Sequence, residues 1–178
     1  MSRAARVAFF LLLVSAPAGL AQAPAAAPES GVTKLGDSQG WEAYTDAAKG
    51  AKICYLIGKP SKSEPATVKR AAVGARVTHR PGEKRTNEVS FAAGYAFKEG
   101  SDAELSIDGK VFSLFTSKDT AWTRDAATDK AVVEALAKGR QAVIKGTSAR
   151  NTSTTDTYTL AGFTHALDDI DKACGVKR

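Results

Sequence analysis

Residues 158–175, YTLAGFTHALDDIDKACG, decide the fold of this chain. A short β-like segment at 158–160 leads into a predicted helix. The apolar residues of this helix follow one another at steps of four, three and four, which places them on one side of it. They are Phe163, Leu167, Ile170 and Cys174. This apolar stripe predicts that the helix packs on a sheet formed by the residues that precede it.

The stripe ends at one of only two cysteines in the chain, Cys54 and Cys174. An even number of cysteines in an exported protein favours a disulfide, which here would close a loop of about 120 residues. The chain-entropy model gives such a loop a stabilisation of at most about 4 to 5 kcal/mol. The alternative is a redox-active or nucleophilic thiol, but the chain has no CxxC motif and no histidine near either cysteine.

The first 21 residues have the pattern of a secretory signal peptide, with two arginines, an apolar run at 7–14 and small residues after it. The run is too short to span a bilayer, so we expect no transmembrane segment in the mature protein. We place the cleavage site after Ala18 or Ala21. The alternative is a buried N-terminal helix. A cleaved signal peptide predicts a periplasmic or secreted protein.

The remaining chain divides into residues 22–36, a Pro/Ala-rich stretch that predicts a disordered spacer, and residues 37–178, which predict one β-rich domain. The formal net charge of the whole chain is +6. Removal of the two arginines of the signal peptide lowers it to about +4. This mildly basic balance is far from the charge density of a dedicated nucleic-acid-binding protein.

Strands dominate the predicted domain, since apolar and polar residues alternate over most of it. The dipeptide Asp108-Gly109 predicts a two-residue hairpin that would set Leu105 opposite Phe112 and Ala103 opposite Leu114. The other expected strands are 40–45, 51–57, 73–80, 89–97, 140–147 and the end of 148–157, with Trp41 and Cys54 on the buried face of the first hairpin and a loop at 59–64.

A first helix is predicted at 128–138, with Thr128 as its N-cap and Gly139 closing its C-terminus. Short strands that outnumber two short helices predict a mainly β, single-domain fold. Its architecture is expected to be a β-sandwich or an open barrel, with the C-terminal helix packed on the sheet.

Catalytic motifs are missing from the sequence. His79 ends a strand and His165 points away from the apolar stripe, and no nucleophile, P-loop, zinc or dinucleotide motif occurs. Asp168, Asp169 and Asp171 lack the spacing of a calcium loop, so we expect them to form a solvated face with Lys172 rather than a metal site. We therefore predict no cofactor, no metal and no enzymatic activity.

The most suggestive surface is a basic cluster around the strand 73–80 and its turn. It comprises Lys69, Arg70, Arg76, Arg80, Lys84 and Arg85. As a binding surface it would attract an anionic glycan, lipopolysaccharide or an acidic protein surface. Nucleic acid is not expected, because no aromatic residues interleave with the cluster to stack bases. The alternative is an ordinary solvated face balanced by Glu83 and Glu88.

Several stretches together resemble the bacterial invasion-associated locus B family. They are Gly40-Trp41, the strand with Cys54, NEVSFAAGYAF, the Asp108-Gly109 hairpin, TDKAVVEALAKG and LAGFTHALDDIDKAC, and they extend over nearly all of the mature chain. The most specific part is the GF-x-x-AL element from Gly162 to Leu167, whose positions are apolar packing positions. Many members have further cysteines, which this chain lacks at Thr45 and between Phe112 and Trp122. It therefore resembles a divergent, two-cysteine branch.

The resemblance implies export and a β-rich fold, and it links the chain to a family associated with host-cell entry, for which no catalytic residues are established. We therefore predict an exported, non-enzymatic binding protein of the bacterial envelope. The alternatives are a structural or envelope-maintenance protein without a single ligand, and an enzyme with a site assembled from distant residues. A binding protein should have a contiguous basic or aromatic patch, whereas an enzyme should have a pocket of converging polar groups.

Overall fold

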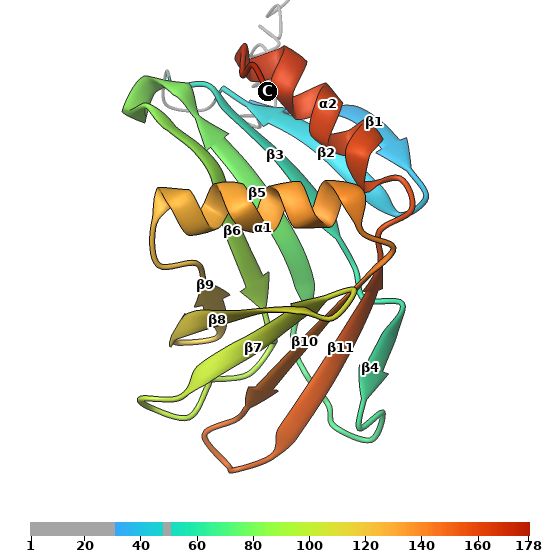
Figure 1. Cartoon of the computed structure of the whole chain (residues 1–178), viewed down its shortest axis with the longest axis vertical. Coiled ribbons are helices and arrows are strands. Elements are labelled where there is room, and N and C mark those ends of the chain that lie inside the picture. The colour runs from blue at the N-terminus through green and yellow to red at the C-terminus, as the bar shows by residue number, and fades with distance from the viewer. Residues whose placement is uncertain (1–30, 48–50) are drawn as a thin grey trace, which may run out of the picture.

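The computed structural model describes residues 31–47 and 51–178. The described chain forms one antiparallel sheet and two helices, α1 (Ala126–Lys138) and α2 (Phe163–Cys174) (Figure 1). The strand order is β1-β2-β3-β5-β6-β9-β8-β7-β10-β11-β4, and the edge strands β1 and β4 do not pair with each other. The predicted mainly β fold is confirmed, and of the two predicted architectures the structure has the open barrel.

The strands alternate with short turns, as the sequence predicts. They are β1 (Val32–Ser38), β2 (Trp41–Asp46), β3 (Ile53–Gly58), β4 (Lys62–Glu64), β5 (Gly74–Arg80), β6 (Arg85–Ala92), β7 (Asp102–Ile107), β8 (Lys110–Ser117), β9 (Thr120–Trp122), β10 (Gln141–Thr147) and β11 (Ser153–Thr159), with a 3-10 turn η2 (Pro81–Glu83) between β5 and β6. The predicted β7–β8 register is confirmed, with Leu105 opposite Phe112 and Ala103 opposite Leu114.

Helix α2 packs on the inner face of the sheet through the predicted stripe. Phe163, Leu167 and Ile170 are buried, and the Phe163 ring meets the buried Trp41 edge to face, with ring centroids 5.0 Å apart. The Trp41 indole N–H donates to the Thr159 carbonyl over 2.9 Å, which joins β2 to the end of β11. The predicted disulfide Cys54–Cys174 is formed and ties the end of α2 to β3. Neither described helix is long and apolar enough to cross a membrane.

Four local predictions are corrected by the structure. Residues 32–36, predicted as spacer, belong to β1, and the predicted loop 59–64 contains β4, which pairs with β11. Strand β6 ends at Ala92 instead of Phe97, because Gly94 adopts a positive φ of 71°. Helix α1 begins two residues earlier than predicted, since the Asp125 side chain accepts the Thr128 N–H and is its N-cap. The predicted signal peptide and residues 22–30 of the predicted spacer lie outside the described residues.

Candidate functional site

The outer face of the sheet presents a row of residues that stand directly opposite one another on successive strands. Register places Arg76 of β5 opposite Ser90 of β6, Ser90 opposite Trp122 of β9, and Trp122 opposite Phe115 of β8. Within β9 the preceding Ala121 is fully buried, so strand alternation directs Trp122 outward. Trp122 is 37% exposed, one of few large apolar side chains of the described chain at this level.

Trp122 lies in an open groove of about 760 Å³ between β6, β8, β9 and the start of α1. We call it the aromatic–basic groove. Its aromatic residues are Phe115 and Trp122, its basic residues are Lys84, Arg85, Arg124 and Lys130, and its acidic residues are Glu88, Asp125 and Asp129. The combination of an exposed aromatic ring with four surrounding cations makes this groove the strongest candidate binding site.

The acidic residues of the groove are engaged by other groups. Glu88 pairs with Arg80 and Arg85, and Asp125 caps helix α1, where the Thr128 N–H lowers the pKa of its carboxyl. Asp129 is buried at the base of the groove and accepts both the Thr123 hydroxyl and the Val89 N–H. Burial raises the pKa of Asp129, and these contacts join α1 to β6 and β9.

The basic residues of the groove differ in whether they form ion pairs with acidic side chains. Arg85 pairs with Glu83 and Glu88, and Arg124 pairs with Asp102. Lys130 lies 4.0 Å from Glu134 and is 71% exposed at its side chain. Lys84 forms none of the ion pairs between described residues. Lys84 and Lys130 are therefore the cations most available to an anionic ligand.

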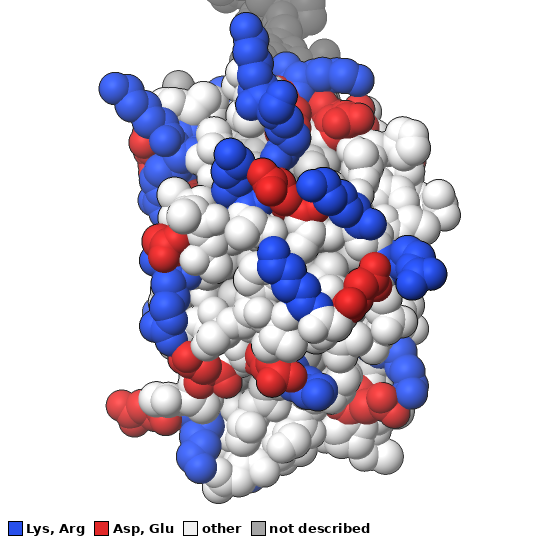
Figure 2. Space-filling view, viewed as in Figure 1, with Lys and Arg blue, Asp and Glu red and all other residues white. Residues whose placement is uncertain are grey.

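The six residues of the basic cluster expected from the sequence lie in different surroundings in the structure. Arg70 is unavailable to a ligand, because its guanidinium is buried and makes two hydrogen bonds, of 2.6 and 2.8 Å, to the buried Asp156. Arg80 is held by Glu88, while Lys69 lies exposed in the loop before β5. Figure 2 shows basic and acidic side chains interspersed over the face that it draws. Of the six predicted residues, only Lys84 and Arg85 line the aromatic–basic groove.

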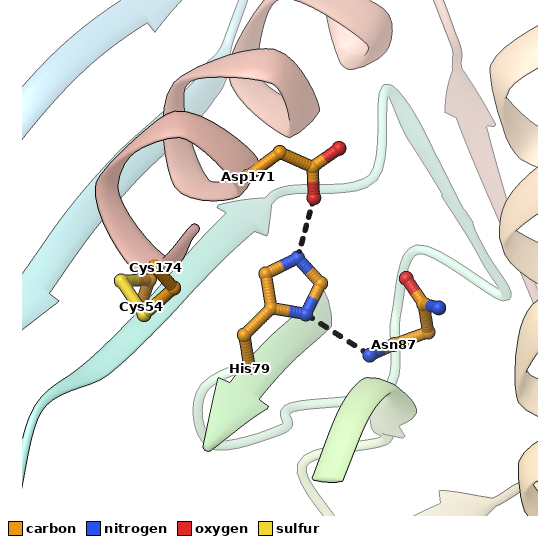
Figure 3. The surroundings of a disulfide bond; sticks show 5 residues. All are labelled: Cys54, His79, Asn87, Asp171 and Cys174. Carbon is orange, nitrogen blue, oxygen red and sulfur yellow. Dashed lines mark hydrogen bonds and ion pairs between the residues drawn. A yellow bond between two sulfur atoms is a disulfide. The ribbon is translucent and has the colours of Figure 1, made fainter. Parts of the chain in front are cut away.

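His79 has an aspartate partner that the sequence analysis did not find. The fully buried ring lies between α2 and the start of β6, with Nε2 2.8 Å from an Asp171 carboxylate oxygen and Nδ1 accepting the Asn87 N–H over 3.0 Å (Figure 3). Since Nδ1 accepts a hydrogen bond, the proton is on Nε2, which donates to Asp171. Both ring nitrogens are occupied and shielded from solvent, so the pair holds α2 to the sheet and is not arranged as a catalytic base.

Asp171 itself was predicted to be solvated, and this prediction is wrong. Its side chain is buried next to the disulfide and also accepts hydrogen bonds from Arg178. Burial alone would raise the pKa of the Asp171 carboxyl, but the hydrogen bonds from His79 and Arg178 outweigh it and lower the pKa. Asp168 is exposed as expected and Asp169 is half-buried. Within the described ranges no group of three histidine, cysteine or acidic side chains is placed to hold a metal ion.

Sequence reasoning missed Trp122, Arg124 and Lys130 as site residues. The available signal was the pattern Ala121-Trp122-Thr123, in which a tryptophan alternates with small residues that face the other side of the strand. The sequence alone does not place Lys130 beside Trp122, because this requires knowing that the start of α1 packs on β6. That contact depends on the Val89–Asp129 hydrogen bond between residues 40 positions apart.

Comparison with known families gives one match. Residues 41–171 match the family model described as Invasion associated locus B (IalB) protein. The matched range includes β2 to β11, all of α1, most of α2 and all the residues of the aromatic–basic groove. No curated protein and no solved structure matches the chain.

Proposed function

Since the chain belongs to the invasion associated locus B family, a family linked with host-cell entry, we propose that it is an exported envelope protein that binds an anionic glycan. The aromatic–basic groove is the proposed site. The observation on which the proposal depends is the exposed Trp122 ring inside a groove that also contains Lys84, Arg85, Arg124 and Lys130.

The chemistry of the groove suits a sugar acid. The apolar C–H faces of a sugar ring can pack on the Trp122 indole, which loses exposed apolar surface on binding. The ammonium groups of Lys84 and Lys130 attract the carboxylate or sulfate groups of such a sugar and raise its local concentration. Phe115 stands opposite Trp122 in the strand pair and extends the aromatic surface.

Export is supported by the disulfide. Structural disulfides form and persist in oxidising compartments such as the periplasm and the cell exterior. The Cys54–Cys174 bond joins β3 to α2. A binding role instead of an enzymatic one is supported by the closed hydrogen bonding of His79, whose two nitrogens are used inside the protein.

Binding is tested by calorimetry of the purified protein with heparin oligosaccharides and with neutral dextran as the uncharged comparison. We expect salt-sensitive binding of heparin alone. Trp122→Ala and the double variant Lys84→Glu/Lys130→Glu should each weaken it at least tenfold. The matched control is Lys69→Glu/Lys98→Glu, which changes the net charge by the same amount at exposed lysines outside the groove and should bind as the wild type does.

The outcomes are distinct. Equal weakening by both lysine double variants would mean that only net charge matters, and the groove would be rejected as the site. No binding of any acidic glycan by the folded wild-type protein would overturn the glycan proposal itself.

A further inference from the structure

We propose that the glycan-binding surface continues from the aromatic–basic groove across β6 to Arg76, so that the protein takes a linear polyanionic oligosaccharide instead of a single acidic sugar. This inference rests on the proposed function and specifies its ligand. It draws on the strand register, on the surroundings of Arg76 and on a second groove beside it.

The register places the two ends of the proposed surface on one line. Trp122, Ser90 and Arg76 stand opposite one another on β9, β6 and β5. Neighbouring strands lie about 4.8 Å apart, so Trp122 and Arg76 are separated by about 10 Å across the sheet. The residue between them, Ser90, is small and only 7% exposed, so the ligand would cross the side chains that cover it. A single sugar ring could not contact both ends, but a chain of several rings could.

Arg76 is prepared to receive an anion. Its guanidinium stacks on the Tyr55 ring at 3.9 Å from the ring centroid, and Tyr55 in turn stacks on Tyr44 with ring centroids 5.3 Å apart. Arg76 takes part in none of the ion pairs recorded between described residues, whereas Arg70, Arg80, Arg85, Arg124, Arg140 and Arg178 all do. The stack holds the guanidinium plane in place, and its N–H edge can form a paired hydrogen bond to a carboxylate or sulfate.

Arg76 is exposed and its guanidinium remains charged. Partial burial lowers the pKa of this guanidinium, whereas the nearby Tyr55 and Asp46 oppose the shift.

A second open groove of about 550 Å³ lies beside Arg76, between the start of β2, the end of β3 and the start of β5. Its lining includes the cations Lys59 and Arg76 and the carboxylates Asp37 and Glu42, both of which pair with Lys34. Gly58 also lines it, where a Cβ atom would fall 2.5 Å from the Trp41 ring. Strand β6 lines both grooves, the first through Glu88 and Val89 and the second through Ala92. The two grooves therefore meet the same strand on either side of the buried Ser90, and the proposed ligand would extend from one to the other.

The experiment measures how affinity depends on ligand length. Heparin-derived di-, tetra- and hexasaccharides are titrated into the wild-type protein, Arg76→Gln and Arg150→Gln. Arg150 is the matched control, because it is exposed and forms no ion pair among the described residues but lies in the turn before β11, away from both grooves. We expect the affinity of the wild type to rise at least tenfold from disaccharide to hexasaccharide.

Arg76→Gln should lower the affinity for the hexasaccharide at least fivefold and leave the affinity for the disaccharide unchanged. Arg150→Gln should leave both affinities unchanged. Arg76→Lys, which keeps the charge but cannot form the paired hydrogen bond, should recover only part of the loss. Equal wild-type affinity for all three lengths, or full hexasaccharide affinity in Arg76→Gln, would overturn the extended site. In either case disaccharide binding that is lost in Trp122→Ala would leave the proposed function standing, whereas no binding at any length would remove both.

Discussion

Reduction of the Cys54–Cys174 bond should lower the free energy of unfolding by about 3 to 5 kcal/mol. The two cysteines are 120 residues apart, and for a loop of this length the chain-entropy model gives about 5 kcal/mol at room temperature. Measured values often fall below this model, so it sets the upper end of the range. The bond joins β3 to the last residue of α2. We expect the packing of Phe163, Leu167 and Ile170 to remain in place when the bond is reduced, because all three are buried.

The assay is urea unfolding of the same wild-type protein with and without reductant, followed by tryptophan fluorescence. Trp41 is a suitable probe because it is buried between Tyr158 and Phe163 and becomes exposed on unfolding. Thiol titration verifies the redox state of each sample. The control is Cys54→Ala/Cys174→Ala, whose transition should not respond to reductant. A difference below about 1 kcal/mol between oxidised and reduced wild type would refute the reasoning, because the loop closure would then contribute almost nothing.

Two further predictions concern α2. Phe163→Ala should destabilise the protein by about 3 to 5 kcal/mol in the same urea assay, because the ring is fully buried against Trp41. The control is His165→Ala on the exposed side of the helix, which should be nearly neutral. A loss of stability well below this range for Phe163→Ala would contradict the described packing. The lowered pKa of Asp171 means that the unfolded chain binds its proton more readily, so its stabilisation is present above the ordinary value of 3.8 and is lost as the pH falls through the lowered folded value. Asp171→Asn should therefore be less stable than wild type at neutral pH and lose less stability on acidification. The measurement is the free energy of unfolding of both proteins from pH 2 to 7, and an equal loss in variant and wild type on acidification would contradict this linkage.

The inner face of the sheet could be predicted from the sequence because its signals are local. Asp108 and Gly109 both adopt positive φ angles, of 44° and 92°, as the two-residue hairpin requires, and the flanking apolar residues then fix the register. The α2 stripe has the helical period and ends at a cysteine whose partner is the only other one in the chain. In both cases a few neighbouring residues determine the structure.

The edge strands could not be predicted in this way. Strand β1 has no buried residue, and it is a strand because it pairs with β2. Strand β4 consists of three residues whose middle member, Ser63, donates a hydrogen bond to Asp156, 93 positions later. The polar contacts Arg70–Asp156 and His79–Asp171 join residues 86 and 92 positions apart. No local pattern indicates such partners, because each belongs to a different strand or helix.

The candidate site was predictable only in part for a related reason. Nearness in sequence suggested that six basic residues act together, but strand pairing decides which cations remain available. The β5–β6 hairpin brings Glu88 to Arg80, and the barrel interior takes Arg70. The buried small residues on either side of Trp122 in the sequence indicate that its ring faces outward. Arg124 is close to it in sequence, but Lys84, Arg85 and Lys130 come from the start of β6 and from α1, whose positions depend on the whole fold.

The two faces of the sheet therefore have separate requirements. Residues Gly162 to Leu167 lie at the α2 contact with the inner face, where Gly162 has a positive φ of 86° and a Cβ atom would meet the Ser38 carbonyl. Changes there disturb packing and stability. Trp122 and Arg76 lie on the outer face, where a substitution should cost less stability than one at the fully buried Phe163. If the outer row binds the ligand, variants at Trp122 and Arg76 should lose more affinity than stability, and variants at Phe163 should show the opposite. Such a separation would place recognition on the outer face independently of any family comparison.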